Sequence, residues 1–212
     1  MTAERPDSPD AVTAAAVTTA PADWPDVERL FGARGEPSRC WCRFFALTGA
    51  EWNDSTPGDR KNQLRAKFDA GAPAPGVLAF RDGTPVGWCA VEPRDCYPRI
   101  LRSQVLKAAG PAVHSQPGNG LDGPVWSVSC FVVAPGHRRS GVAAALLRAA
   151  GGHAATHGAG IVEGYPVDPA SRPKAGPADL YHGTLKLFLD AGFEVVSDAV
   201  PGRAVVRLAA LA

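Results

Sequence analysis

The sequence has no apolar run long enough to span a membrane, and it does not open with the basic and then apolar segment of a secretory signal. It also lacks an excess of either charge, because 22 lysines and arginines are balanced by 21 aspartates and glutamates. Proteins that bind nucleic acid in bulk usually carry a strongly basic face. We therefore expect neither a membrane nor a nucleic acid among the partners.

Cysteine is scarce, and its count of five is odd. Without a secretory signal, such a set is typical of reduced thiols, so we expect a cytoplasmic protein. Cys40 and Cys42 stand one residue apart, but no second Cys pair or Cys/His pair follows at the spacing of a metal site. The sequence therefore predicts no metal, and a metal-stapled binding protein is the least favoured of three function classes.

The chain of 212 residues, 45% of them hydrophobic, is the size of one domain with a substantial core. Residues 1–10 are polar and contain prolines, so we expect a disordered tail there and a single domain over 11–212. β-branched and aromatic segments predict strands at 12–19, 76–81, 85–92, 125–133, 160–165, 193–196 and 204–208. Helical patterns cover 26–31, 57–70, 100–109, the segment after 141 and 180–191. This order predicts an α/β fold in which helices cover both faces of one sheet.

The most distinctive segment is 125–150, where a strand pattern stops at a Pro-Gly turn and a helix pattern begins after a basic loop. The first N–H groups of such a helix have no partners within the helix and lie at the positive end of its dipole. Gly141 lets the backbone approach an anion closely because it has no Cβ. Arg138 and Arg139 are unfavourable there unless an anion binds, so the loop predicts a pyrophosphate site.

The spacing Arg-x-x-Gly-x-Ala is neither the nucleoside-triphosphate loop nor Gly-x-Gly-x-x-Gly. It resembles the acyl-CoA loop of the GCN5-related N-acetyltransferase (GNAT) superfamily, and Arg138, Gly141 and Ala143 fill its three fixed positions. The Val-x-Pro lead-in at 133–135 and the Phe-x-x-Ala-Gly-Phe run at 188–193 extend the resemblance, which covers roughly residues 12–208. It implies a GNAT-like mixed and mostly antiparallel sheet, with acetyl-CoA as the acyl donor.

The resemblance also implies how acetyl-CoA is held. A bulge in the strand at 125–133 would direct a backbone N–H at the acetyl oxygen, near 131–133, and the loop at 138–143 would hold the pyrophosphate. The residues expected to bind acetyl-CoA are Phe131, Val132, Val133, Arg138, Arg139, Ser140, Gly141, Val142 and Ala143.

The candidate acid and base depart from the family pattern. The strand at 125–133 has no carboxylate, and Glu163 is the one carboxylate in an apolar strand, where it is suited to accept a proton near neutrality. The alternative is a glutamate paired with an arginine at the edge of a cleft. Phe188 stands where the family has a tyrosine acid, which leaves Tyr181 as a substitute or as a packing residue. A water molecule or the departing amine proton could instead protonate the thiolate.

Aromatic residues are the candidates for an acceptor site. Trp41, Phe44, Phe45 and Trp88 are expected to form an apolar wall, with Arg39 or Arg43 recognising an acidic group. Asp95, Cys96, Tyr97 and Arg99 are expected near the acetyl end. The alternative for each aromatic residue is the core.

We expect an N-acetyltransferase that moves an acetyl group directly from acetyl-CoA to an amine, preferably of a small molecule. The alternative is a non-catalytic acyl-CoA-binding sensor or partner-binding module. A homodimer is left open.

Overall fold

The computed structural model describes residues 16–32, 35–71, 73–114, 123–172 and 177–210, so the tail predicted at 1–10 lies outside the described residues. Within these ranges the strands are β1 (Thr18–Pro21), β2 (Gly76–Arg81), β3 (Thr84–Pro93), β4 (Val125–Val133), β5 (Ile161–Gly164), β6 (Glu194–Val200) and β7 (Arg203–Ala209). They form one sheet in the order β1-β2-β3-β4-β5-β7-β6. Only β4 and β5 pair in parallel among these strands, which confirms the mixed and mostly antiparallel sheet.

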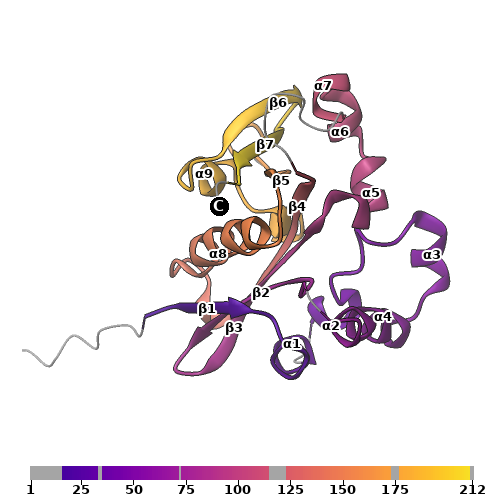
Figure 1. Cartoon of the computed structure of the whole chain (residues 1–212), viewed down its shortest axis with the longest axis vertical. Coiled ribbons are helices and arrows are strands. Elements are labelled where there is room, and N and C mark those ends of the chain that lie inside the picture. The colour runs from indigo at the N-terminus through magenta and orange to yellow at the C-terminus, as the bar shows by residue number, and fades with distance from the viewer. Residues whose placement is uncertain (1–15, 33–34, 72, 115–122, 173–176, 211–212) are drawn as a thin grey trace, which may run out of the picture.

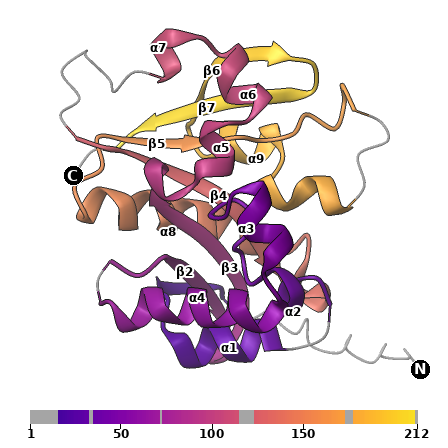
Figure 2. The same cartoon turned by 90° about the vertical axis from the view of Figure 1, so that its right-hand side faces the viewer.

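Helices pack on both faces of this sheet, as Figures 1 and 2 show. Those before β2 are α1 (Trp24–Gly32), α2 (Pro37–Cys40), α3 (Gly49–Asp54) and α4 (Pro57–Asp69). Between β3 and β4 lie the turn η1 (Arg94–Cys96), α5 (Pro98–Leu101), α6 (Gln104–Ala108) and α7 (Pro111–His114). The remainder are η2 (Pro135–His137), α8 (Val142–Thr156), η3 (Pro177–His182) and α9 (Leu185–Leu189). No described helix is long and apolar enough to cross a membrane.

The core is divided by the sheet. On one face, α8 and α9 pack against Val128 and Phe131 of β4. On the other face, the helices before β2 pack against Cys130. Since successive side chains of a strand point to opposite faces, Val128 and Phe131 can share a face only if the alternation is broken between them.

A β-bulge at Ser129 breaks that alternation. The pairing of β3 with β4 jumps from Ala90 opposite Cys130 to Val91 opposite Val128, which leaves Ser129 as the extra residue. The parallel pairing of β5 with β4 also ends at Val128. The bulge therefore lies where β4 and β5 separate, two residues before the position expected at 131–133.

The hairpin predicted at 76–81 and 85–92 is confirmed as β2 and β3. Asp82 and Gly83 form its turn with φ angles of 48° and 69°. Two successive positive φ angles are typical of the type I′ turn, whose twist matches that of the strands it joins.

The helix predicted at 180–191 is wrong, because the chain forms η3 and then the short helix α9. Gly183 separates the two with a φ of 80°, and Thr184 starts α9 by accepting a hydrogen bond from the Leu187 N–H at 3.3 Å. The predicted end at Gly192 is displaced as well, because α9 ends at Leu189 with Asp190 as its C-cap, and Gly192, with a φ of 87°, lies in the turn that follows. The first strand is also displaced, from 12–19 to β1 at Thr18–Pro21, and residues 12–15 lie outside the described residues.

A substitution at Gly164 of β5 can test the packing between the sheet and α9. A Cβ at this position would overlap the Phe188 ring, whose Cζ would lie 2.7 Å away. We expect Gly164→Ala to lower the free energy of unfolding by about 1–3 kcal/mol, the usual cost of overpacking. Urea unfolding followed by circular dichroism measures it.

Gly152→Ala in α8 is the matched control, because no atom lies within 4 Å of the added Cβ. It should raise stability by about 0.5–1 kcal/mol, since alanine is the better helix former. Equal stability of Gly164→Ala and the unmodified protein would contradict this packing.

Candidate active site

The loop before α8 presents an anion-binding surface. Arg139 and Gly141 have φ angles of 56° and 82°, and Gly141 caps α8. The first turn of α8 has no acidic residue and no side-chain cap, while Arg138 and Arg139 are exposed beside it. Ser140 donates its hydroxyl to the His137 carbonyl at 2.6 Å, which fixes the loop locally. Backbone N–H groups and two guanidinium groups are thus available to an anion.

The side chains of the other residues expected to bind acetyl-CoA are buried or half-buried. Val142 is buried in the core, and Phe131 packs against Phe188 with ring centroids 6.2 Å apart. Val132 and Val133 are half-buried at the end of β4. Phe188 is itself fully buried, so it has only a packing role where the family has a tyrosine.

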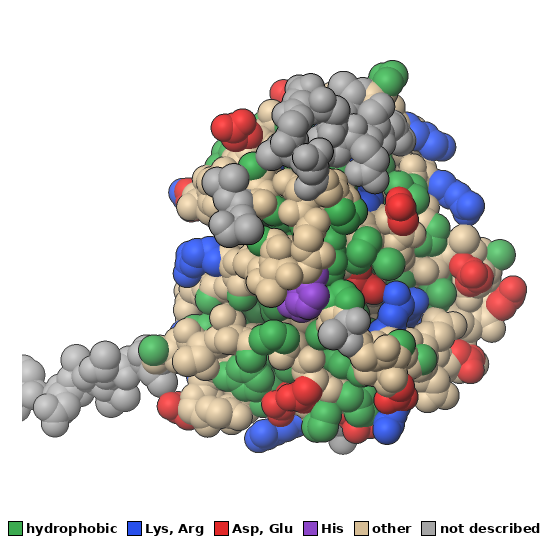
Figure 3. Space-filling model, in the orientation of Figure 1, with side chains coloured by type: hydrophobic (Ala, Val, Ile, Leu, Met, Phe, Trp, Pro, Cys, Tyr) green, Lys and Arg blue, Asp and Glu red, His purple; other side chains and the backbone are tan. Residues whose placement is uncertain are grey.

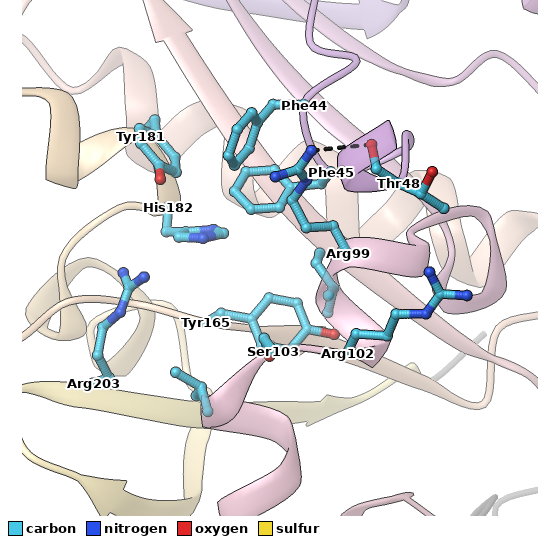
Figure 4. A pocket seen from close by; sticks show the side chains of 13 residues that line it. Phe44, Phe45, Thr48, Arg99, Arg102, Ser103, Tyr165, Tyr181, His182 and Arg203 are labelled. Atoms are coloured by element: carbon cyan, nitrogen blue, oxygen red, sulfur yellow. Dashed lines mark hydrogen bonds between the residues drawn. The ribbon is translucent and has the colours of Figure 1, made fainter. Parts of the chain in front are cut away.

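A pocket of about 380 Å³ lies on the face of the sheet opposite α8. Along β7, Val206 packs on the α8 side, whereas Val205 packs with Tyr165 and the helices between β3 and β4. Tyr165 and those helices line the pocket, together with the segment before α3 and the end of η3 (Figure 4). On the surface in Figure 3, hydrophobic side chains gather between the part that carries α6 and β6 and the part that carries α1 and α4.

Aromatic rings form much of the pocket wall. The ring of Phe45 lies 4.6 Å from that of His182 and 5.6 Å from that of Tyr181, measured between centroids. Of the residues predicted for the acceptor, the acetyl end and the acid, Phe44, Phe45, Arg99 and Tyr181 line this pocket. Tyr181 also packs against the cluster that contains Cys130, so it lies between the pocket and the end of β4.

Trp41, Trp88 and Tyr97 lie in the core and do not line the pocket, which corrects their expected role in an acceptor wall. Their exposed fractions are 5%, 0% and 1%. Trp41 stacks on Trp24 at 5.9 Å, and Trp88 meets the edge of Phe31 at 5.7 Å. Burial of such large rings stabilises the fold by removing apolar area from water. The core alternative therefore describes both tryptophans, and Tyr97 lies in the core as well.

Glu163 is fully buried and held by three partners. The Arg94 Nη1 atom lies 3.4 Å from both carboxylate oxygens, and the Arg207 Nη2 atom lies 2.7 Å from Oε2. The Tyr165 hydroxyl donates to Oε1 at 2.6 Å. Glu163 does not line the pocket, so the ion-paired alternative describes it and the role of general base is not supported by its position.

Tyr165 links this ion cluster to the pocket. Its hydroxyl lies 2.7 Å from the Ser127 hydroxyl as well as against Glu163. Burial, the charge of Glu163 and the hydrogen bond to it raise the pKa of Tyr165 well above its usual value. Tyr165 therefore remains protonated and positions the pocket wall.

His182 lies between the pocket and the bulge. Burial and then the charge of Arg203 lower its pKa to about 3, against an interaction with the backbone of Ser129 that raises it. Its imidazole is therefore neutral, and Nδ1 has no hydrogen-bond partner among the residues that the structure describes. Sequence analysis missed His182 together with Tyr165, Arg102 and Arg203, whereas Arg99 was expected near the acetyl end and lines the pocket.

The Cys40-Trp41-Cys42 segment is a packing element. Trp41 and Cys42 both have a φ of 47°, which turns them into the core beneath β4. A hydrogen bond with Cys130, followed by burial, raises the pKa of the Cys42 thiol well above its usual value. In the described part of the chain, no three His, Cys, Asp or Glu side chains are grouped to hold a metal ion.

Comparison with known proteins identifies one family. Residues 38–172, more than half of the chain, match the family model described as the acetyltransferase (GNAT) family. No curated protein matches the sequence.

Solved structures of the same overall size are similar to the chain at low sequence identity. The protein yncA of Salmonella typhimurium, solved with its cofactor acetyl-CoA, is 15% identical over 92% of this chain and 94% of that one, with a TM-score of 0.48. The ribosomal-protein-alanine N-acetyltransferase of Brucella melitensis is 17% identical over 91% and 99%, with a TM-score of 0.49. A GNAT-family acetyltransferase of Bacillus cereus is 13% identical over 93% and 99%, with a TM-score of 0.47.

Glu163→Gln separates the structural role of this residue from a catalytic one. The change leaves two arginines buried without their counter-charge, so we expect a loss of about 3–5 kcal/mol in the free energy of unfolding. Glu194→Gln, at an exposed position of β6, should change it by less than about 0.5 kcal/mol. Unaltered stability of Glu163→Gln with loss of acetyl transfer would instead support the general base.

The buried neutral imidazole of His182 predicts a pH dependence. Between about pH 6.5 and pH 3 the unfolded chain binds a proton at this residue and the folded chain does not. Stability therefore falls as the pH decreases through that range, by up to about 1.4 kcal/mol per pH unit from this proton. His182→Phe should have a shallower profile of unfolding free energy against pH, and parallel profiles for the two proteins would refute the assignment.

Proposed function

The chain belongs to the acetyltransferase (GNAT) family, with acetyl-CoA as acyl donor, and we propose that it acetylates the amine of a small molecule bound in the pocket by direct transfer. The observation that carries this proposal is the position of the pocket. It lies across the sheet from the α8 face and reaches the β4 bulge through His182. Its volume of about 380 Å³ is in the range of small-molecule sites.

The residues for the donor fit its charge. The two exposed arginines of the 138–143 loop and the uncapped N-terminus of α8 would hold the pyrophosphate. The thioester of acetyl-CoA supplies the activated acyl group. Beyond Val128, β4 has no pairing with β5, and a backbone N–H at the bulge would polarise the acyl carbonyl.

The acceptor amine must be neutral to attack. The described residues that line the pocket include three arginines and no carboxylate, so positive charge there favours the uncharged amine. We propose that the amine loses its proton to water on binding and that Glu163 takes no part. Tyr181, between the pocket and the end of β4, is the candidate donor of a proton to the leaving thiolate.

The reaction needs no covalent enzyme intermediate. Cys130 of β4 is buried on the face of the sheet that carries α1 and α4, and it packs against Cys42. Holding the two substrates together lowers the barrier by up to about 7–11 kcal/mol in well-oriented systems, so positioning supplies a large part of the catalysis.

Thermal unfolding with acetyl-CoA tests the donor site. At 100 times its dissociation constant, acetyl-CoA should stabilise the protein by about 2.7 kcal/mol, whereas ATP should not. Arg138→Glu should weaken this stabilisation because it places an anion beside the pyrophosphate. Arg148→Glu, at an exposed position further along α8, makes the same charge change and should keep it.

Release of free CoA thiol in the presence of an amine panel tests the transfer. Thiol release that depends on an amine, with the acetylated amine detected by mass spectrometry, is the expected result. Stabilisation by acetyl-CoA without transfer to any amine would favour the non-catalytic acyl-CoA-binding alternative. Absence of stabilisation by both acetyl-CoA and free CoA would remove the basis of the proposal.

A further inference from the structure

The pocket has a marked charge asymmetry. Among its lining residues that the structure describes, the charged side chains are those of Arg99, Arg102 and Arg203, and no aspartate or glutamate accompanies them. The whole chain, in contrast, is nearly neutral. A pocket with positive charge alone favours an anionic group on its ligand.

Two of the three arginines already interact with other residues of the fold. Arg99 donates from Nε to the Leu47 carbonyl at 3.3 Å and from Nη2 to the Thr48 carbonyl at 3.1 Å. Its guanidinium also lies 4.1 Å from the centroid of the Phe44 ring. Hydrogen bonds with Thr48, and after them the nearby charge of Arg102, lower the pKa of the Glu51 carboxyl, so Arg102 lies close to that carboxylate. These contacts hold the rim of the pocket and account for Arg99 and Arg102. The position of the third arginine, Arg203, is not explained by contacts of this kind.

Arg203 makes no such contacts among the described residues. Its half-buried side chain has no hydrogen bond or ion pair with any residue of the described ranges. Figure 4 shows it on the side of the pocket across from Arg99, extending towards Tyr181 and His182. Arg203 is the first residue of β7 and follows the turn that ends at Gly202, so the strand and the turn fix the position of its backbone. Partial removal of a guanidinium group from water costs free energy, and pairing with an anion offsets that cost.

His182 gives the second part of the argument. Its neutral ring is next to Arg203, and its unpartnered Nδ1 is buried. A neutral imidazole nitrogen can accept a hydrogen bond from an amine, whereas a charged imidazolium cannot. On its other side His182 meets the backbone of Ser129, at the bulge. An amine at His182 would therefore lie near the acyl group, with its neighbouring anion at Arg203.

We infer that the acceptor is an amine that also carries a carboxylate a few bonds away, an amino-acid-type molecule whose carboxylate pairs with Arg203 while its amine faces His182. This inference rests on the proposed transfer reaction and names its substrate class. The aromatic wall of Phe44, Phe45 and Tyr181 would contact the carbon skeleton. The same positive charge that binds the carboxylate makes the ammonium form of the acceptor less favourable, so one residue serves both recognition and deprotonation.

Matched acceptor pairs test the carboxylate. Each pair consists of an amino acid and its decarboxylated amine: phenylalanine and 2-phenylethylamine, tyrosine and tyramine, and tryptophan and tryptamine. The readout is kcat/KM from thiol release. We expect at least one α-amino acid to exceed its α-decarboxylated partner by about 10- to 100-fold, the range of a hydrogen-bonded charge pair.

Arg203→Gln assigns the preference to this residue. It should abolish the preference, mainly by raising KM for the amino acid, so that each amino acid and its decarboxylated amine have similar kcat/KM. Arg203→Lys should restore part of it. Arg172→Gln is the control, because Arg172 is exposed, packs against Gly202 and does not line the pocket, and it removes the same charge from the neighbouring loop.

A binding readout keeps the inference separate from the transfer reaction. N-acetylphenylalanine and N-acetyl-2-phenylethylamine are compared for their stabilisation of the protein against heat, with and without free CoA. Stronger stabilisation by the carboxylate compound, lost in Arg203→Gln, supports the inference even if no acceptor on the panel is turned over. Equal rates and equal stabilisation within every pair would overturn it while leaving acetyl transfer intact. Failure of every amine to react, with acetyl-CoA bound, would instead count against the proposed function.

Discussion

The buried carboxylate of Glu163 is the interaction on which the pocket depends. It brings together Arg94, from the connection between β3 and β4, and Arg207 of β7, and both guanidinium groups also donate to the Val113 carbonyl, at 2.9 and 2.6 Å. A carboxylate with no exposed surface is strongly unfavourable unless it is paired in this way. The cluster therefore ties the helices between β3 and β4 to the second half of the sheet, and those helices form one side of the pocket. Tyr165, held by the same carboxylate, forms another.

The second constraint is the bulge at Ser129. It changes the side-chain alternation of β4 beside the residue where the pairing with β5 ends. The gap between the two strands therefore begins at the bulge. The 138–143 loop and α8 stand on one side of this point, and the aromatic pocket stands on the other. A donor and an acceptor that approach from opposite faces would meet there, next to a neutral imidazole. In the proposed arrangement the charges of the pocket, rather than a carboxylate base, would keep the amine uncharged.

Local features of the fold could be predicted from the sequence, and long-range ones could not. The Asp82-Gly83 turn and the start of the helix after Gly141 are set by residues next to one another, and both were predicted correctly. The role of Glu163 depends on arginines 69 and 44 residues away, which no local pattern links to it. The bulge is a property of pairing between strands, so its place at Ser129 could not be read from β4 alone. Trp88 and Phe44 show the limit for aromatic residues, because a core and a pocket wall use the same side chains. The break at Gly183 was visible in the sequence, but a glycine inside a helical pattern is often tolerated.

A crystal structure of the protein with acetyl-CoA tests the central claim most directly, namely that donor and acceptor meet at the bulge of β4. The account predicts the pyrophosphate on the backbone N–H groups and arginines of the 138–143 loop. It predicts the acetyl group beside Ser129, open to the pocket at His182. A pyrophosphate bound elsewhere, or an acetyl group separated from the pocket by the sheet, would contradict it.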